Sequence, residues 1–381
     1  MKRNPWLFLV VLVALFALSV VTSYSQSTKT FNVGGGGSLL VKVVGDVALK
    51  TSSAGSVTVE ALGIAPEDLA DLSITQTDNS VRVEFRPDNG HSRNIRFNIG
   101  LPDHFDVDIT TAGGDVSVTG NLTGRIVGKT AGGDVRVGNV DGTTNLTTAG
   151  GDITAGKVGG DVVFKTAGGD IRLDSAEGVV QVATSGGDII VGEVGKSLDA
   201  KTSGGDIRIT NINGDANAST SGGDVRVGKV AGTATLSTAG GDIECQGATG
   251  DIKVSTAGGD VVLKAISGSL DASTAGGDIR AEFNPDGKGT SSLTTAGGEL
   301  EITLPAGARA RIEAVIEIEG RWSTGREEYQ ILSDFKALDL VMDDQHKEIR
   351  GIFEINGGGE LIKMKTVNGN IQIRKAGGGA N

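Results

Sequence analysis

Aspartate is the residue type whose spacing could most readily support chemistry in this chain. A Thr-(Ala/Ser)-Gly-Gly-Asp motif occurs ten times, and the last nine copies recur at intervals of 18 residues. An eleventh copy, Thr295 to Glu299, carries glutamate in place of aspartate. Regularly stacked carboxylates could bind Ca²⁺, which takes oxygen ligands readily. The ten aspartates are Asp115, Asp134, Asp152, Asp170, Asp188, Asp206, Asp224, Asp242, Asp260 and Asp278.

We favour a structural role for this aspartate column over calcium binding, which stays the alternative. The glycine pairs and the 18-residue double unit resemble the calcium-binding β-roll nonapeptides, but those need Gly-Gly-x-Gly-x-Asp. Here the aspartate follows the glycine pair directly. We expect each aspartate to accept backbone N–H bonds within its own turn, as Asp beside Gly commonly does. Outward arginines two residues later, which offset part of the charge, are Arg136, Arg172, Arg208, Arg226 and Arg280.

Catalysis is not expected from the remaining residues. Glycoside hydrolases place one specific pair of carboxylates across the scissile bond, whereas here the acids recur on every unit. Cys245 stands in a column of small apolar residues, which indicates a core position. The histidines, which lie only in the end regions, are His91, His104 and His346. We predict no catalytic and no cofactor-binding residues. The alternative is a polysaccharide-active β-helix enzyme, whose cleft should then be sought in the irregular segment 283–350.

The threonines of the motif could form a hydroxyl ladder of the kind that ice-binding solenoids expose. By alternation, however, Thr166 lies on the same side of its strand as Val162 and Phe164. We therefore expect these hydroxyls to point inward and to close the turn.

The 18-residue period predicts the elements that position these side chains. A fixed short period is the signature of a solenoid, in which each unit buries its apolar face only against its neighbours. In the unit from Asp170 to Gly187, two short stretches alternate between apolar and polar residues as half-buried strands do. Glycine turns connect the two strands. At the glycine pair we expect a positive φ, which would strain a side chain with Cβ.

Three apolar columns indicate a narrow core between two closely spaced sheets, with coils stacked in register at ~4.8 Å. The residues that follow the aspartates are Val116, Val135, Ile153, Ile171, Ile189, Ile207, Val225, Ile243, Val261 and Ile279. Two residues further on stand Val118, Val137, Ala155, Leu173, Val191, Ile209, Val227, Cys245, Leu263 and Ala281. The second strand contributes Leu146, Phe164, Val182, Ala200, Ala218, Leu236, Val254 and Ala272.

The predicted fold is all-β: a single elongated parallel β-solenoid or β-helix with about 18 residues per coil and irregular β caps. We expect a signal peptide at 1–25, an N-terminal cap with irregular coils at 26–110, regular repeats at 111–281 and a C-terminal irregular region with a cap at 282–381. Thr51 to Val59 is interpreted as a degenerate early copy of the repeat, and Thr366 to Ile373 as a final one. Glu67 to Leu72 is expected to form one short helical turn.

The N-terminus predicts export to the periplasm, the outer surface or the medium. Lys2 and Arg3 precede an apolar run from Trp6 to Val21, which is typical of a signal peptide. We expect cleavage after Ser25; an uncleaved leader that anchors the chain in a membrane is the alternative. The single cysteine excludes both an internal disulfide and a lipoprotein attachment site in the leader.

Charge and composition exclude several partners. The net charge is −12, and basic residues do not cluster beyond the first few positions, so nucleic acid is not an expected partner. Attraction to an anionic membrane surface is excluded on the same ground. Only the leader, if uncleaved, is expected to contact a membrane.

The leader, the repeated Gly-Gly-Asp-(Ile/Val) units and the closing Thr-Val-Asn-Gly-Asn-Ile-Gln-Ile resemble the bacterial putative-adhesin family of β-strand-repeat proteins, over about residues 30–375. The resemblance implies an exported, non-enzymatic protein with an adhesive role and no residues of known function. We expect a repetitive polar face that binds a glycan or protein ligand of the cell envelope multivalently. A structural or self-assembling envelope spacer is the alternative.

Overall fold

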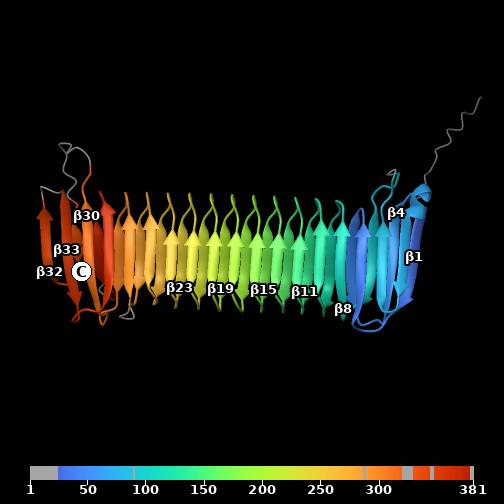
Figure 1. Ribbon diagram of the computed structural model, residues 1–381, viewed down its shortest axis with the longest axis horizontal. Helices are drawn as coiled ribbons and strands as arrows, with labels where there is room; N and C mark the ends of the chain where they lie inside the picture. The colour runs from blue at the N-terminus through green and yellow to red at the C-terminus, as the bar shows by residue number, and fades with distance from the viewer. Residues whose placement is uncertain (1–24, 89–90, 286–288, 320–328, 344–346, 378–381) are drawn as a thin grey trace, which may run out of the picture.

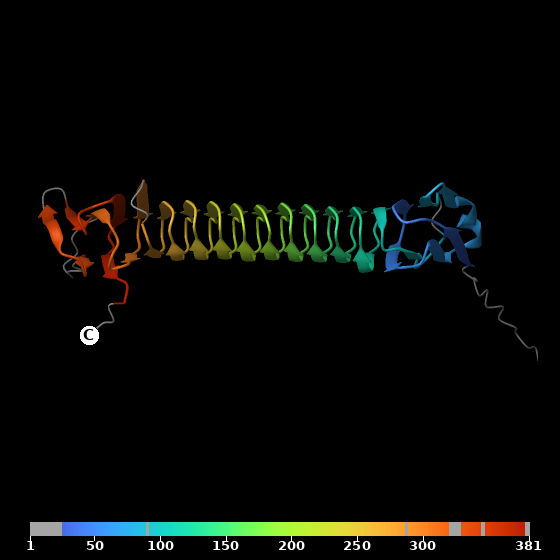
Figure 2. The same ribbon diagram turned by 90° about the horizontal axis from the view of Figure 1, so that it is seen from below.

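The computed structural model describes residues 25–88, 91–285, 289–319, 329–343 and 347–377. These residues form a long rod in which short strands cross the rod axis and stack from one end to the other (Figure 1). Figure 2 shows the two layers of strands running along the regular middle of the rod. Among the described residues the only helix is the 3₁₀ segment η1 (Pro66–Asp71), which confirms the short helical turn expected at Glu67 to Leu72. The protein is therefore all-β, as predicted.

The strands belong to two sheets, whose spatial order follows from the pairing of the described residues. Sheet A contains β1 (Ser25–Asn32), β4 (Ser56–Ile64), β7 (Arg96–Pro102), β3 (Asp46–Ser52), β9 (Val116–Leu122), β11 (Val135–Val140), β13 (Ile153–Val158), β15 (Ile171–Ala176), β17 (Ile189–Val194), β19 (Ile207–Ile212), β21 (Val225–Val230), β23 (Ile243–Ala248), β25 (Val261–Ile266), β27 (Ile279–Phe283), β29 (Leu300–Leu304), β35 (Ile371–Lys375) and β31 (Ile331–Ser333).

Sheet B contains β5 (Leu72–Thr77), β6 (Ser80–Phe85), β2 (Gly37–Val43), β8 (Phe105–Thr111), β10 (Ile126–Thr130), β12 (Thr144–Thr147), β14 (Val162–Lys165), β16 (Val180–Ala183), β18 (Leu198–Lys201), β20 (Ala216–Ser219), β22 (Ala234–Ser237), β24 (Ile252–Ser255), β26 (Leu270–Thr274), β28 (Thr290–Thr295), β34 (Glu360–Val367), β30 (Ala310–Glu317), β33 (Glu348–Ile355) and β32 (Ala337–Asp343).

Parallel pairing between successive repeats builds the middle of both sheets. In sheet A, Ile153 of β13 lies opposite Ile171 of β15, and in sheet B, Val162 of β14 lies opposite Val180 of β16. The chain alternates between the sheets, so strands from neighbouring repeats pair while strands within one repeat face each other. This arrangement is solenoid-like, and it explains why the apolar columns keep their register over many repeats.

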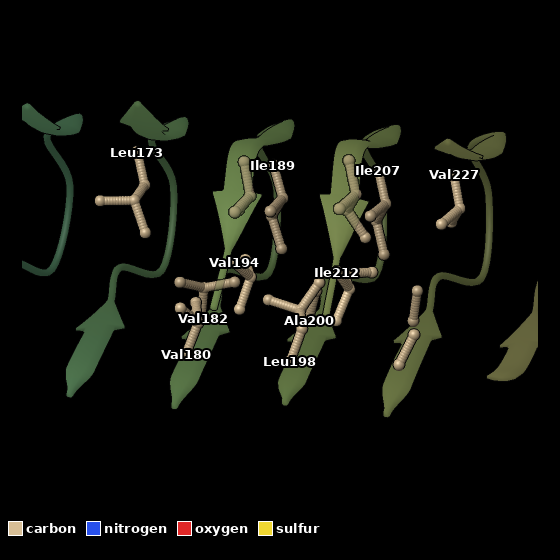
Figure 3. Packing of buried hydrophobic residues seen from close by; sticks show 14 of the residues in the cluster. Leu173, Val180, Val182, Ile189, Val194, Leu198, Ala200, Ile207, Ile212 and Val227 are labelled. Carbon is tan, nitrogen blue, oxygen red and sulfur yellow. The ribbon is translucent and has the colours of Figure 1, made fainter. Parts of the chain in front are cut away.

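The apolar columns form one continuous hydrophobic core between the sheets. All residues of the three predicted columns are buried, and Cys245 is 0% exposed in the place predicted for it. A further column follows the bend of each sheet A strand and includes Val158, Val194 and Val230. Figure 3 shows side chains from both sheets meeting across the core, among them Leu173, Ile189, Ile207 and Val227 of sheet A and Val180, Val182, Leu198 and Ala200 of sheet B.

Both ends of the rod depart from parallel pairing. At the N-terminal end β1, β4 and β7 pair antiparallel, and at the C-terminal end β30, β33 and β32 do the same. The expected early copy at Thr51 to Val59 is wrong. Val47 of β3 lies opposite Val116, so the first repeat equivalent begins at Gly45-Asp46-Val47, and β4 is an added antiparallel strand.

The expected final copy at Thr366 to Ile373 is confirmed. Ile371 of β35 lies opposite Leu300 of β29, as the corresponding residues of the regular repeats do. The Thr366 hydroxyl also donates to the Gly298 carbonyl at 2.7 Å, which is the contact that the motif threonines make.

The first residue of most central strands of sheet B is apolar, and Thr144 of β12 is the polar exception. This threonine provides a test of the packing. Its side chain lies between Ile126 and Val162 in the register of sheet B, is 1% exposed, and its hydroxyl has no hydrogen-bond partner among the described residues. We expect Thr144→Val to raise the free energy of unfolding by about 1 kcal/mol, because it replaces an unpaired buried hydroxyl with a methyl group of similar size. Urea denaturation measures this change.

The matched control is Thr148→Val, at a buried threonine that directly follows β12. Its hydroxyl donates to the Gly133 carbonyl at 2.9 Å and accepts from the Gly151 N–H at 3.3 Å. Valine at this position should lower the free energy of unfolding by about 1–2 kcal/mol. Equal effects of the two substitutions would contradict the difference in hydrogen bonding between these threonines.

The expected leader lies almost wholly outside the described residues, which begin at Ser25. Within the described part of the chain, no helix is long and apolar enough to cross a membrane.

Candidate functional site

The aspartate column forms a hydrogen-bonded ladder along one edge of the rod. The Asp134 Oδ1 atom accepts the backbone N–H of Asp152 at 2.9 Å, and the Asp152 Oδ1 atom accepts that of Asp170 at 2.8 Å. The same contact recurs up to Glu299, whose N–H donates to the Asp278 carboxylate at 2.8 Å. The expectation that each carboxylate caps its own turn is therefore wrong, because the donor belongs to the next repeat. Each aspartate joins two coils.

Arginines neutralise part of this ladder. The Arg136 guanidinium lies 2.6 Å from the second carboxylate oxygen of Asp134. Arg208 contacts Asp206 of its own repeat at 2.6 Å and Asp188 of the preceding repeat at 3.6 Å. Arg226 and Arg280 make the same short contact within their own repeats, at 2.7 Å in each case.

Arg172 is the exception among the predicted arginines. It contacts Asp174 at 3.8 Å, on the outer face of its own strand, and its expected pairing with the column is wrong. Four of the five predicted arginines therefore offset the aspartate column.

The hydrogen bonds lower the pKa of several carboxyl groups. The backbone N–H of Asp152 is the main cause for Asp134, with a further contribution from Arg136. A second carboxylate ladder occupies the opposite turn: the pKa of Asp215 is lowered chiefly by the backbone N–H of Thr233, and that of Asp251 chiefly by the Ser269 side chain. At Asp134, Asp215 and Asp251 the hydrogen bonds therefore favour the ionised state of the carboxyl group.

Acid should consequently weaken the rod. A carboxyl whose pKa is lower in the folded than in the unfolded chain stabilises the fold above its ordinary value of about 3.9 and loses that contribution as the pH falls through the lowered pKa. We expect a constant melting temperature from pH 7 to about pH 5 and a progressive decrease below pH 4. Thermal denaturation across this range measures it, and Asp134→Asn should show a smaller decrease. A melting temperature independent of pH down to pH 2 would contradict the stabilising role of the ladders.

The glycine pair of each motif is explained by close contact between neighbouring coils. Neither glycine of the central motifs has a positive φ, so the expected left-handed conformation is wrong. A Cβ on Gly205, the second glycine of its motif, would lie 2.1 Å from the Gly187 carbonyl oxygen of the preceding coil. A Cβ on Gly204, the first glycine, would lie 3.2 Å from its nearest neighbour. Only the second glycine is sterically required.

The motif threonines close the same turn from inside. The Thr166 hydroxyl donates to the Gly151 carbonyl at 2.9 Å and accepts the Gly169 N–H at 3.3 Å, and the side chain is 9% exposed. The inward orientation predicted by alternation is confirmed, and an ice-binding face made of these residues is excluded. Thr, Gly and Asp of one motif thus each contact a neighbouring coil.

Other side chains that could be reactive have structural surroundings in the described residues. Burial raises the pKa of the Cys245 thiol, which disfavours the reactive thiolate. The buried Asp68 accepts hydrogen bonds from the Ser92 hydroxyl at 2.5 Å and the Ser92 N–H at 2.8 Å, and the ring of His91 lies 3.4 Å away. The carbonyl of His104 accepts a backbone bond, and His346 lies outside the described residues.

Carboxylates are not gathered for metal binding in the described segments. No three His, Cys, Asp or Glu side chains there converge in a way that could hold a metal ion. In the aspartate column one oxygen of each central carboxylate is engaged by a backbone N–H, and at Asp134, Asp206, Asp224 and Asp278 an arginine engages the other. This arrangement leaves few free lone pairs for a cation at those positions.

A shallow groove of about 220 Å³ crosses the outer face of sheet A. Arg208 and Arg226 form one side, and Thr210, Gly228 and Gln246 lie along it. The sequence reasoning missed this groove. The available signal was Gly228, a residue without a side chain in an outward column where neighbouring repeats carry Thr210 and Gln246.

A second groove of about 400 Å³ follows the bend of the first repeats. Its lining is polar: the Asn139 amide donates to Asn121 at 3.1 Å, and the Thr123 hydroxyl donates to Asp141 at 3.3 Å. Lys157 supplies a cation. Such a surface offers donors and acceptors to a hydroxyl-rich ligand, and it was also missed by the sequence reasoning.

The parallel coils and their side-chain ladders define a repetitive, non-globular class of β protein. A family model matches residues 41–227 and, in a second match, 192–319. The chain belongs to this family, Toastrack DUF4097. The match confirms the family resemblance inferred from the sequence. No curated protein matches the chain.

Several solved structures are similar to the chain along most of its length. A putative adhesin from Bacteroides fragilis is 12% identical, covers 93% of this chain and 98% of its own, and has a TM-score of 0.23. A putative adhesin from Parabacteroides distasonis is 11% identical, with the same coverages and a TM-score of 0.22. A putative lipid binding protein from the same species is 10% identical, covers 91% of this chain and 96% of its own, and has a TM-score of 0.24.

Proposed function

We propose that the chain is an exported, non-enzymatic adhesin: a single β-solenoid of about 18 residues per coil that binds envelope or cell-surface ligands multivalently. The observation that supports this most directly is the repetition of outward polar residues at the same place on successive coils. Arg208 and Arg226 lie directly opposite each other in the parallel register, and strands in such a register lie ~4.8 Å apart. Weak contacts repeated at this interval add up to avidity.

The ligand class that we propose is a glycan or protein of the cell envelope. The two grooves provide arginine, asparagine, threonine and carboxylate groups, which bind hydroxyl and amide groups by hydrogen bonds. The chain does not depend on a cofactor in this proposal, and nucleic acid is disfavoured by the net charge of −12.

The test is binding to immobilised envelope glycans and surface proteins at high and low density. Deleting residues 189–206 removes one coil and joins Asp188 to Ile207, so the Gly-Gly-Asp-Ile motif is preserved. We expect this variant to lose more binding on dense surfaces than on sparse ones, and a variant with that coil duplicated to gain. Arg208→Ala with Arg226→Ala keeps the number of coils and should also weaken binding, because these arginines form one side of the first groove. Retention of no ligand, or binding independent of density and coil number, would contradict the proposal.

A structural envelope spacer is the second candidate, and one observation favours it. The polar groups of the ladder largely use their hydrogen-bonding capacity on one another. Each Asp carboxylate accepts the backbone N–H of the Asp in the next repeat, Arg pairs with Asp, and the Thr hydroxyl donates to a Gly carbonyl. Side chains engaged in this way have less capacity for a ligand. The 17 strands that the described residues contribute to sheet A span roughly 77 Å at ~4.8 Å per strand, a length that could separate two partners. A chain that retains no ligand yet is required for envelope integrity would support this role.

Export and the loss of the leader are part of the proposal. The leader motif supports secretion with cleavage after Ser25, so the mature chain would start at Gln26. Mass spectrometry of the chain recovered from an exporting bacterial host tests this directly. An intact N-terminus in the membrane fraction would instead support the anchored alternative.

We further propose that the aspartate column acts without calcium. Backbone N–H groups and arginines supply the positive partners that Ca²⁺ would otherwise provide. Millimolar Ca²⁺ should therefore leave the melting temperature unchanged, whereas a bound ion would raise it by mass action. A calcium-dependent increase that is lost in Asp152→Asn would restore the calcium alternative.

A further inference from the structure

The C-terminal end of the rod exposes apolar side chains that the rest of the molecule buries. Among the described residues, five of the six exposed large hydrophobic side chains lie on β31 and β32. They are Leu332 at 52%, Leu338 at 64%, Leu340 at 54%, Val341 at 48% and Met342 at 57% exposure. The sixth, Leu69, is 37% exposed at the other end. Figure 1 shows β32 as the outermost strand of the C-terminal end.

This exposure follows from the unequal length of the two sheets. In the described part of the chain, sheet A ends with the three-residue strand β31, whereas sheet B continues from β30 through β33 to β32. Met342 lies opposite the buried Ile349, so it is on the core-facing side of β32. Leu340, two residues earlier, shares this side. No described strand of sheet A covers these two side chains.

Strand β32 also has an unpaired backbone edge. Its only neighbour among the described strands is β33, to which it is antiparallel. An exposed apolar edge strand readily pairs with another chain. The opposite end differs: the edge strands β1 and β5 are mostly polar, and the apolar Ile74 of β5 is buried. The two ends are therefore not complementary to each other.

We propose that β32 pairs with β32 of a second copy of this chain, antiparallel and about a twofold axis at Leu340. The antiparallel direction continues the alternation of β30, β33 and β32. In this register Leu340 faces Leu340 of the partner and Asp339 faces Val341. Leu338, which lies at a register shift of β32, is then nearest to Met342 of the partner. Every exposed apolar residue of β32 gains an apolar or backbone neighbour, and no two carboxylates are opposed.

Charge selects this register over its neighbours. Residues opposed in an antiparallel pair share a face, so the register changes in steps of two residues. An axis at Asp339 would oppose the two Asp339 carboxylates, and an axis at Val341 would oppose Asp339 and Asp343. Like charges directly opposite destabilise a sheet. The axis at Leu340 pairs Asp339 to Val341, which lie beyond the register shift of β32 at Leu338, without such a contact.

The same argument favours a closed dimer over a filament. An isologous contact uses the same strand on both copies and leaves β32 with no free edge. Head-to-tail growth would require the polar N-terminal strands to accept β32. The result is a tail-to-tail rod of double length, with the N-terminal strands β1 of the two copies at its far ends.

Light scattering and sedimentation of the full chain, as an exporting host produces it, test the oligomeric state. We expect a concentration-dependent dimer that Leu340→Lys weakens at least ~100-fold, because two ammonium groups would meet at the axis. Leu69→Lys, at the opposite end, should leave the dimer unchanged. Circular dichroism confirms that both variants fold, since both positions are exposed. A monomer at all concentrations, an assembly larger than two copies, or a dimer unaffected by Leu340→Lys would overturn the proposal.

Disulfide trapping tests the register. Directly opposed residues have Cα atoms about 4.5–5.5 Å apart, within reach of a disulfide, whereas diagonal neighbours are about 7–8 Å apart. Leu340→Cys should therefore cross-link to itself under mild oxidation. Asp339→Cys should do so poorly alone but efficiently when mixed with Val341→Cys. The native Cys245 is buried and does not interfere. Equal self-cross-linking of Leu340→Cys and Asp339→Cys would exclude this register.

Discussion

Gly205→Ala is expected to lower the free energy of unfolding by about 3 kcal/mol, although it adds only one methyl group. The new Cβ would lie 2.1 Å from the carbonyl oxygen and 2.4 Å from the carbonyl carbon of Gly187 in the preceding coil. These atoms belong to the backbone and cannot rotate away. The coils would have to separate locally, which weakens the neighbouring Asp–N–H and Thr–carbonyl bonds as well.

Gly204→Ala is the matched control, one residue earlier in the same motif. Its Cβ would lie 3.2 Å from the Gly186 carbonyl oxygen, a tight contact that a small shift relieves. We expect a change within about 1 kcal/mol, since alanine also restricts the unfolded chain. Denaturant unfolding of both variants measures the difference. Equal destabilisation would show that backbone conformation, rather than the approach of the preceding coil, explains the second glycine.

Phe164→Ala is expected to have the second large effect, a loss of about 3–5 kcal/mol. Phe164 is 0% exposed and stands in register with Leu146 and Val182 of the adjacent coils. Other positions of this column hold alanine, such as Ala200 and Ala218, but Phe164 is the largest side chain in the column and its truncation removes the most volume. Truncation at one coil leaves a cavity that the regular stacking on both sides prevents from closing.

Val163→Ala provides the control for Phe164→Ala. Val163 is on the same strand but points to the outer face, where it is partly exposed. We expect a loss below about 1 kcal/mol, because little apolar surface is buried there. Thermal unfolding distinguishes the two variants. An equal loss of stability in the two variants would contradict the tight packing of the core around Phe164.

The central fold could be predicted because periodicity carries its information. Ile171, Leu173 and Val182 alternate with polar residues at the same positions in each repeat, so burial follows from parity alone. The partner of Asp134 could not be found in this way. The N–H groups of its own turn and that of Asp152, one coil away, are equally reasonable donors to its carboxylate when only the sequence is considered. Only the stacking geometry decides between them, and the same holds for the second glycine of each motif.

The ends of the rod were less predictable because they lack the period. The segment from Thr51 to Val59 has a Ser-Ala-Gly-Ser turn that resembles the repeat, yet the true equivalent begins at Gly45. Antiparallel strands such as β4 and β33 are specified by pairing across long sequence separations. The candidate grooves were missed for a related reason: Gly228 creates a hollow only because its neighbours on adjacent coils have larger side chains.

The ladder contacts between coils also determine how the rod responds to pulling. Each regular coil is held only by its two neighbours, through bonds such as Asp224 to Asp206 and Thr220 to Gly205. Tension applied to the two ends therefore peels coils from an end one at a time. Each step frees one 18-residue repeat, or about 60 Å of extended chain, and the remaining coils stay folded. We therefore expect the rod to lengthen in 18-residue steps under load instead of failing in a single event.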